Sequence, residues 1–367
     1  MIQIAKTIKK ERLRRGMTQE ALAEYLNTTK TTISKWENAS LYPDITMLPK
    51  LAKVFNISVD DLLNYSITMT DEEIKKISIS LSKTINHTSY PEYLATLREY
   101  YITHCNEFKF LNSLLGILLN NILYCENELQ LKETASLTHE IIKTTEDNSE
   151  SIHLKKHAQG YKTLLYMFEG DYSSVIENTP DFDLKIGESA TLTLAYLQQD
   201  NISKAKNVIQ TDMYQSLMIF MHDFALMLSR DLHSVSIESL ESKLYHLNQA
   251  FNVDYLYPHL SINCYYQFAL YYTEKTDSRA IDYLKKYCKC FDYLVRDFVY
   301  QKDDFFNEID EWLDTLALGE RLPANYENTI NTVYSLVTEN EHFNTLENFE
   351  YIKKDLLSIY NKKGESN

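Results

Sequence analysis

Residues 17–38 read MTQEALAEYLNTTKTTISKWEN, and this stretch decides the fold of the N-terminal part of the chain. Thr18 and Thr29 are good N-cap residues, and each precedes a short run whose apolar side chains recur at helical spacing. Asn27 lies between the two runs and tolerates the left-handed backbone conformation that a tight turn requires. The stretch therefore predicts two short helices that cross at a tight turn.

The second of these helices, over residues 30–37, has an inner and an outer side. Ile33 and Trp36 are three residues apart and face the core. The polar side chains at the other positions face outward, and they are Lys30, Thr31, Ser34 and Lys35. Further helices are predicted before and after this pair, over residues 4–15, 45–55 and 59–63, which completes a five-helix unit.

This pattern, followed by Pro43-Asp44 and by residues 51–63, resembles the phage-repressor (Xre/Cro) family of helix-turn-helix proteins. The resemblance extends over residues 4–64. In that family the second helix braces the DNA backbone and the third enters the major groove. A unit that only docks onto another protein is the alternative, and the outward Lys and Thr side chains disfavour it.

The resemblance implies a role for individual residues of the helix-turn-helix. Side chains that face base edges would be Lys30, Thr31, Ser34 and Lys35. Side chains that hold phosphate oxygens would be Gln19, Thr29, Thr32 and Asn38. Arg12 and Glu37 match an internal ion pair of the family, which would fix the first helix against the third.

Charge is unevenly distributed along the chain. The 37 Lys+Arg and 52 Asp+Glu residues give a net charge of −15 over 367 residues. The first 55 residues contain ten basic and five acidic side chains, a net +5, so the remainder carries −20. A basic N-terminal part attracts a polyanion, whereas the acidic remainder repels one.

The composition indicates long helices joined by short loops. The chain has 7 Gly and 6 Pro, far below the roughly 12% of residues that these two types usually contribute. The five cysteines show no disulfide framework, which is typical of reduced thiols. Because the sequence shows neither a secretory signal nor an uninterrupted apolar run of about 18 residues, a cytoplasmic protein without a membrane partner is predicted.

Degenerate internal repeats follow the basic segment. Three ten-residue stretches, which begin at Tyr166, Tyr196 and Tyr271, align without gaps, and each has Tyr, a polar turn and then Val or Ala. A fourth begins at Leu228, and the intervals of 30, 32 and 43 residues bracket the tetratricopeptide period of about 34. These stretches resemble degenerate tetratricopeptide hairpins, which stack into a superhelix with a concave inner surface.

The predicted fold is therefore all-α: an N-terminal five-helix Xre-type helix-turn-helix domain followed by a tetratricopeptide-like helical-repeat superhelix. We call residues 1–64 the head and residues 70–360 the body. Residues 65–69 are predicted to be a linker, after which Thr70-Asp-Glu-Glu73 forms a capping box. Residues 361–367 are predicted to be a flexible tail.

A head and a body of these kinds resemble the RRNPP group (Rap, Rgg, NprR, PlcR, PrgX), which are intracellular receptors for secreted signalling peptides in Gram-positive bacteria. The resemblance implies a homodimer that binds a pseudo-palindromic operator in double-stranded DNA. It also implies that a short signalling peptide fills the concave surface of the body and changes the spacing of the two heads. It implies no cofactor.

Amide and imidazole groups within apolar helices of the body are candidates for contacts with the peptide. Asn and Gln amides both donate and accept, so they suit the backbone of an extended peptide. Structural amides that bond between helices are the alternative. The candidates are Asn120, Asn121, His222, Asn263 and Gln267.

No catalytic or metal site is predicted. His153 and His157 lie one helical turn apart, but Leu154 stands where a zinc protease has its general-base Glu. Cys288 and Cys290 lack a second ligand pair at zinc spacing. Two other functions remain open: a constitutive repressor whose body only oligomerises, and a regulator that sequesters another protein through the repeats.

Overall fold

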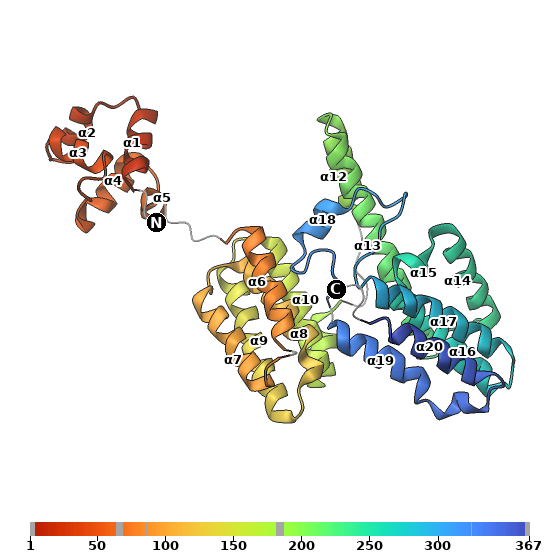
Figure 1. Ribbon diagram of the computed structural model, residues 1–367. Coiled ribbons are helices and arrows are strands. Elements are labelled where there is room, and N and C mark those ends of the chain that lie inside the picture. The colour runs from red at the N-terminus through yellow and green to blue at the C-terminus, as the bar shows by residue number, and fades with distance from the viewer. Residues whose placement is uncertain (1–3, 64–68, 86, 181–186, 324, 364–367) are drawn as a thin grey trace. The chain divides into compact units, whose positions relative to one another are not determined.

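The computed structural model describes residues 4–63, 69–85, 87–180, 187–323 and 325–363 (Figure 1). These residues form helices, and their β-structure is limited to an isolated antiparallel bridge between Val299 and Arg321. The all-α prediction is confirmed. The chain divides into two compact units, residues 1–69 and residues 70–367. Residues 65–68 of the predicted linker and residues 364–367 of the predicted tail lie outside the described residues.

The first unit contains the head helices at the predicted places. They are α1 (Ile4–Arg14), α2 (Gln19–Tyr25), α3 (Lys30–Glu37), η1 (Ile45–Met47), α4 (Leu48–Phe55) and α5 (Val59–Leu63). Thr18 caps α2 by accepting from the Ala21 amide at 3.1 Å, and Thr29 caps α3 by accepting from the Thr32 amide at 3.1 Å. Asn27 has a φ of 50°, so the predicted left-handed turn is confirmed.

All five head helices contribute to one apolar core. Its fully buried members are Ile8, Leu22, Ile33, Leu51, Phe55 and Leu62, and Trp36 is 4% exposed. The predicted fourth helix differs at its start, because η1 precedes α4 as a separate 3-10 turn capped by Asp44. Pro49 explains the break, since it has no amide hydrogen with which to extend an α-helix back to residue 45.

The second unit contains the body. Its first helices are α6 (Asp71–Thr84), α7 (Tyr90–Thr103), α8 (Phe108–Asn120), η2 (Ile122–Tyr124), α9 (Glu128–Asn148), α10 (Ile152–Glu169) and α11 (Tyr172–Asn178). Its later helices are α12 (Glu188–Gln198), α13 (Ile202–Ser229), α14 (Ile237–Phe251), α15 (Val253–Leu256), α16 (Pro258–Glu274), α17 (Arg279–Arg296), α18 (Asp310–Thr315), α19 (Tyr326–Thr338), η3 (Glu341–Thr345) and α20 (Phe349–Tyr360). The predicted capping box of Thr70 and Glu73 opens α6.

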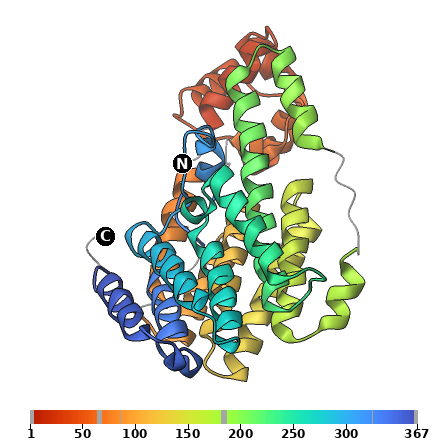
Figure 2. The ribbon, with the colours of Figure 1, turned by 90° about the vertical axis from the view of Figure 1, so that its right-hand side faces the viewer.

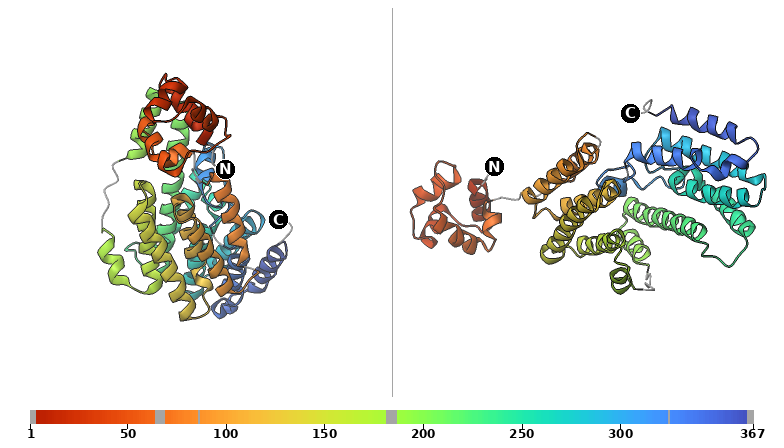
Figure 3. Two further views of the ribbon diagram at one scale, coloured as in Figure 1. Left: turned by 90° about the vertical axis from the view of Figure 1, so that its left-hand side faces the viewer. Right: turned by 90° about the horizontal axis from the view of Figure 1, so that it is seen from below.

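Body helices that are close in sequence pack against one another. α8, α9 and α10 contact each other, α6 packs on α8, and α7 packs on α9 (Figure 1). Farther along the chain, α12 lies beside α13 (Figure 2). α17 packs on both α16 and α20, as the right-hand view in Figure 3 shows. Within the described residues, no helix has the length and apolar character that a membrane span requires.

The four aligned repeat stretches coincide with the turns of helical hairpins. Each turn holds one residue in the left-handed conformation: Gly170, Asp200, Asp231 and Thr276, with φ of 75°, 56°, 52° and 55°. The first joins α10 to α11, the second α12 to α13, the third α13 to α14, and the fourth α16 to α17. The prediction of helical hairpins from the repeat spacing is therefore confirmed.

Tyrosines fill much of the core between α13 and α20. A buried tyrosine hydroxyl is costly unless it has a hydrogen-bond partner, and here backbone carbonyls provide partners. The Tyr214 hydroxyl donates to the Gln301 carbonyl at 3.0 Å, and the Tyr257 hydroxyl donates to the Tyr214 carbonyl at 2.9 Å. The Tyr287 hydroxyl donates to the Val333 carbonyl at 2.6 Å. The abundant tyrosines thus join helices that lie far apart in the sequence.

His259 on α16 makes the stability of the body depend on pH. Burial lowers the pKa of His259 from 6.5 to about 4, and its Nδ1 is buried with no hydrogen-bond partner among the described residues. Above pH 6.5 the imidazole of His259 is neutral in both the folded and the unfolded chain. As the pH falls from 6.5 towards about 4, only the unfolded chain takes up this proton, so stability is lost over that range.

We expect the H259Q variant to lose about 3 kcal/mol less stability than the wild type between pH 7 and pH 4. Urea unfolding followed by helical circular dichroism at both pH values measures this difference. The H246Q variant is the control, because His246 is exposed on α14. Equal pH dependence in H259Q and H246Q would contradict this account of His259.

Candidate nucleic-acid interface and ligand pocket

The outer face of α3 carries the four side chains that were predicted to face DNA bases. Lys30, Thr31 and Lys35 are exposed, and Ser34 is half-buried. Their spacing places them on one side of the helix, while Ile33 and Trp36 are buried on the other. Lys35 makes no ion pair with any described residue, so its ammonium group is available to an acceptor from outside.

Lys30 already has a partner within the head. Its ammonium group forms an ion pair with the carboxylate of Glu20 on α2, and both side chains are mostly exposed. The hydrogen bond from Lys30 holds the pKa of Glu20 below its usual value. Sequence analysis did not identify this contact, which joins the two helices of the helix-turn-helix at their exposed edge.

The residues predicted to hold phosphates lie around the ends of α2 and α3. Thr29 and Thr32 share a hydrogen bond of 2.9 Å between their hydroxyls at the start of α3. Asn38 is exposed at the end of α3, where its Nδ2 donates to Ser34 Oγ at 3.4 Å. Gln19 opens α2 and is half-buried.

A hydrogen-bonded network joins α1, α2 and α3 through Arg12, Gln19 and Glu37. Arg12 Nε lies 2.6 Å from Glu37 Oε1, and Arg12 Nη2 donates to Glu37 Oε2 at 2.9 Å. Gln19 Nε2 donates to the same Oε2 at 2.9 Å, and Arg12 Nη1 donates to the Met17 carbonyl at 2.7 Å. The pair implied by the family resemblance is thus present, and it also orients the amide of Gln19.

The network changes the ionisation of Glu37. Burial by itself raises the pKa of Glu37, but hydrogen bonds from Arg12 and Gln19 and the charge of Arg12 outweigh it and hold the pKa below its usual value. The pKa of Glu37 is lower in the folded chain than in the unfolded chain, so its ionised form stabilises the folded state. This stabilisation is fully present at pH values above the pKa of the unfolded chain. The stabilisation is lost as the pH falls through the pKa that Glu37 has in the folded chain.

We expect acid unfolding of the head to be less steep in the E37Q variant than in the wild type below the usual glutamate pKa of 4.5. Fluorescence of Trp36, which is 4% exposed in the head core, reports this transition. The E24Q variant is the control, since Glu24 is exposed on α2. The same acid dependence in wild type and E37Q would contradict the role assigned to Glu37.

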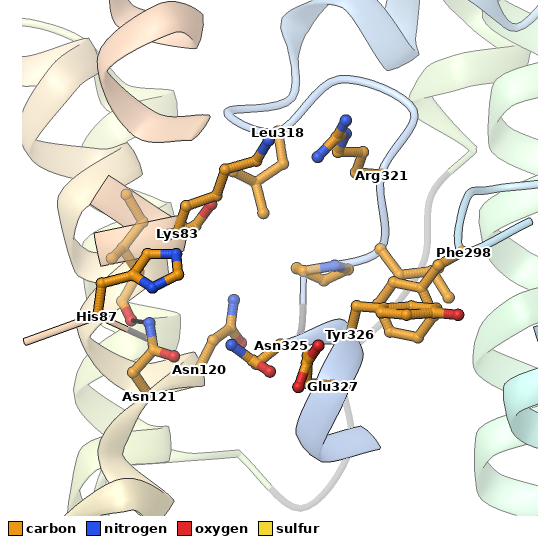
Figure 4. Close-up of a pocket in the computed structure, with 14 residues that line it drawn as sticks. Lys83, His87, Asn120, Asn121, Phe298, Leu318, Arg321, Asn325, Tyr326 and Glu327 are labelled. Carbon is orange, nitrogen blue, oxygen red and sulfur yellow. Dashed lines mark hydrogen bonds between the residues drawn. The ribbon is translucent and has the colours of Figure 1, made fainter. Parts of the chain in front are cut away.

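The body contains a pocket of about 620 Å³ (Figure 4). Its walls come from the end of α6, the end of α8, the segment that precedes α19, and α19 itself. The apolar part of the lining is Ile117, Phe298, Leu318, Leu322, Pro323 and Tyr326. The polar part is Ser82, Lys83, His87, Asn120, Asn121, Arg321, Asn325 and Glu327.

Amides from two sides of the pocket lie close together. Asn120 is exposed at the end of α8, and it faces Asn325 at the start of α19 (Figure 4). Asn121 is 5% exposed, and its Nδ2 already donates to the Tyr93 hydroxyl at 3.0 Å and to the Ile117 carbonyl at 2.8 Å. Asn121 therefore has a structural role, whereas Asn120 is available to a ligand.

The other peptide candidates do not line this pocket. His222 on α13 is exposed with its neighbour Asp223, and His222 Nδ1 lies 3.3 Å from Asp223 Oδ1. Asn263 on α16 is exposed, and its Nδ2 donates to the His259 carbonyl at 3.4 Å; Gln267 is half-buried one turn away. The expectation that the candidate groups are buried within apolar helices is wrong for Asn120, His222 and Asn263, because all three side chains are exposed.

Sequence analysis missed most of the polar groups in the pocket. Two segments more than 200 residues apart supply these groups: one holds Lys83 and His87, and the other holds Arg321 and Asn325. None of the four belongs to a motif. The described residues hold no cluster of three or more His, Cys, Asp or Glu side chains that suits a metal ion. Burial raises the pKa of Cys264 and of Cys288 to about 12, so neither thiol is activated.

The head matches the helix-turn-helix family over residues 8–62. Residues 8–62 are therefore a helix-turn-helix domain, and the prediction of such a domain is confirmed. The HTH-type transcriptional activator BcrR of Enterococcus faecalis is 38% identical over 81 residues, which are 22% of this chain and 39% of BcrR. The HTH-type transcriptional regulator ImmR of Bacillus subtilis is 37% identical over 84 residues, 23% of this chain and 62% of ImmR.

Solved structures are similar over a larger share of the chain but at low identity. Bacillus thuringiensis PlcR, in complex with the peptide PapR7 and DNA, is 15% identical with a TM-score of 0.31, over 80% of this chain and 96% of PlcR. PrgX in its iCF10 complex is 12% identical with a TM-score of 0.28, over 100% of this chain and 97% of PrgX.

Proposed function

We propose that the chain is a transcriptional regulator whose head binds double-stranded DNA with α3 in the major groove. The observation that carries this proposal is the outer face of α3, where Lys30, Thr31 and Lys35 are exposed on a helix whose other side is buried. A helix of this width fits the major groove, where lysine ammonium groups donate to guanine acceptors. The net charge of +5 on the first 55 residues adds attraction for phosphates.

Within this proposal the head divides its side chains between two tasks. Base edges are read by Lys30, Thr31, Ser34 and Lys35. Phosphates are held by Gln19, Thr29, Thr32 and Asn38. Glu37 uses one amide hydrogen of Gln19, so the second hydrogen of that Nε2 remains to donate to a phosphate oxygen.

DNA binding is tested with the purified chain and fluorescent duplexes that tile its own upstream region. We expect one duplex to bind at least about a thousandfold more tightly than a scrambled duplex at the same salt concentration. The K35A variant is expected to weaken that preference by about 1–3 kcal/mol, while the K53A variant, which changes an exposed lysine on α4, keeps it. Equal affinity of the wild type for all duplexes would contradict the proposal.

We further propose that the body senses a short signalling peptide and that the chain acts as a homodimer on a pseudo-palindromic operator. The pocket supports the first part, since about 620 Å³ lies within the range of roughly 300–1,000 Å³ for ligand sites. Asn120 offers its amide to a peptide backbone independently of the peptide's side chains. Two heads would occupy half-sites about 34 Å apart, or a multiple of that distance.

The peptide can change this geometry only if it binds two arrangements of the dimer with different affinity. We expect the N120A variant to weaken the peptide response at least about fivefold, because a hydrogen bond to the ligand backbone is lost. The response is the peptide-dependent change in operator affinity. The N263A variant is the control, since Asn263 is an exposed amide outside the pocket. Equal loss in both variants would contradict the assignment of the pocket.

A further inference from the structure

The segment 314–322 touches both the pocket and the first helix of the body. Leu318, Arg321 and Leu322 of this segment line the pocket. Asp314, at its start, accepts an ion pair from Lys75 on α6, with 3.3 Å between Lys75 Nζ and Asp314 Oδ1. One short segment therefore connects the ligand site to the middle of α6.

Gly319 makes the contact with α6 unusually close. Its φ is +62°, and a Cβ built on it would lie 2.5 Å from Lys75 Cε and 2.7 Å from Lys75 Nζ. A real Cβ cannot approach another atom so closely. The side chain of Lys75 can lie directly on the backbone at position 319 because glycine has no Cβ. A Cβ at position 319 would therefore displace the end of the Lys75 side chain from the backbone of the segment.

The segment is also held on its far side. The Tyr300 amide donates to the Glu320 carbonyl at 2.7 Å, and the Leu322 amide donates to the Phe298 carbonyl at 3.2 Å. Phe298 itself lines the pocket. These backbone hydrogen bonds tie Glu320 and Leu322 to residues 298 and 300. Gly319 directly precedes Glu320, so a ligand that displaces Arg321 or Leu322 also displaces Gly319.

We propose that segment 314–322 is the coupling element through which occupancy of the pocket reaches α6. In the structure, the Lys75 side chain on α6 packs on the backbone of Gly319. A ligand between Lys83 and Arg321 moves the segment, breaks this contact and releases α6, whose first residue follows directly on residue 70 (Figure 4). The inference rests on the proposed function, because it supplies the regulation of the same pocket.

A substitution that fills the pocket serves as the probe, since it needs no ligand. The N120W variant places an indole in the pocket from α8, which belongs neither to α6 nor to the segment. We expect the amides of residues 71–84 to exchange with solvent at least about fivefold faster than in the wild type, the lower end of ordinary coupling between sites. The L123W variant is the control, because Leu123 is 80% exposed and does not line the pocket.

The route of the effect is tested with Lys75. In the K75A background the contact with Gly319 is already lost, so we expect N120W to add no further acceleration in α6. An acceleration that persists undiminished in K75A, or one that L123W reproduces, would overturn the proposal. Full-length protein and hydrogen exchange read by mass spectrometry are used throughout.

Gly319 provides an independent arm of the same test. The G319A variant is expected to accelerate exchange in α6 without any pocket filler, because its methyl group displaces Lys75. The G170A variant is the matched control, since Gly170 also has a positive φ, 75°, and a Cβ there meets no atom within 4 Å. Equal exchange in these two variants would overturn the proposal. Failure of peptide sensing would be distinguishable from failure of this proposal. In that case a peptide fraction would leave operator affinity unchanged, while N120W would still accelerate amide exchange in α6.

Discussion

Replacing Arg12 with methionine is expected to destabilise the head by about 3–5 kcal/mol. The side chains of Arg12 and Glu37 are only 9% and 2% exposed, so the change leaves a carboxylate buried without its cation. The hydrogen bond from Arg12 to the Met17 carbonyl is lost as well. Gln19 remains as a partner, but a neutral amide does not balance the charge of Glu37.

The measurement is urea unfolding of the full chain followed by the fluorescence of Trp36. A W312F background makes Trp36 the sole tryptophan, since the chain has two. The K30M variant is the control: Lys30 pairs with Glu20, but the two side chains are 60% and 58% exposed, so a loss of about 0–1 kcal/mol is expected. The double variant R12M/E37L is expected to be more stable than R12M alone, because it buries no unpaired charge. Equal losses in R12M and K30M would contradict this account.

Replacing Lys30 and Gln19 in separate variants is expected to change DNA binding in two different ways. K30A removes a donor to base acceptors, so the preference for the operator over single-base variants falls by about 1–3 kcal/mol at the base that Lys30 contacts. Q19A removes a phosphate contact, so all sequences bind more weakly by a similar factor. Glu20, which pairs with Lys30 in the free protein, is left without its partner in K30A.

Fluorescence anisotropy on the operator and on a set of single-base variants separates these outcomes. The control is K53A, which removes a lysine charge on α4 away from the outer face of α3. It is expected to lower affinity slightly through charge alone and to leave the preference unchanged. Parallel loss of affinity and preference in K30A and Q19A would show that the two roles are wrongly assigned.

The head was predictable from sequence because its signals are local. Thr18 and Thr29 cap helices within three residues of themselves, and Asn27 turns the chain at its own position. The break before α4 was missed because Asp44 and Pro49 favour a 3-10 turn that apolar spacing does not reveal. The Arg12–Glu37 pair was available only through family resemblance, since 25 residues separate its members.

The pocket was far less predictable, because its walls are brought together by packing between distant helices. Asn120 was identified as a polar residue within an apolar helix, and the pocket includes it. Asn121 shares that pattern, yet its amide is taken by Tyr93 and Ile117. Spacing along one helix cannot distinguish these two neighbours, since the difference lies in which direction each side chain points.

The most direct test of the central claim, a DNA-binding regulator that responds to a peptide, measures operator affinity with and without a signal. Anisotropy of the purified chain is recorded on its own upstream DNA, alone and with the low-mass peptide fraction of the culture medium. The account predicts specific binding whose affinity or stoichiometry changes at least about fivefold with the fraction, and N120A is expected to weaken this change. Specific binding with the same affinity, stoichiometry and salt dependence in both conditions would contradict it.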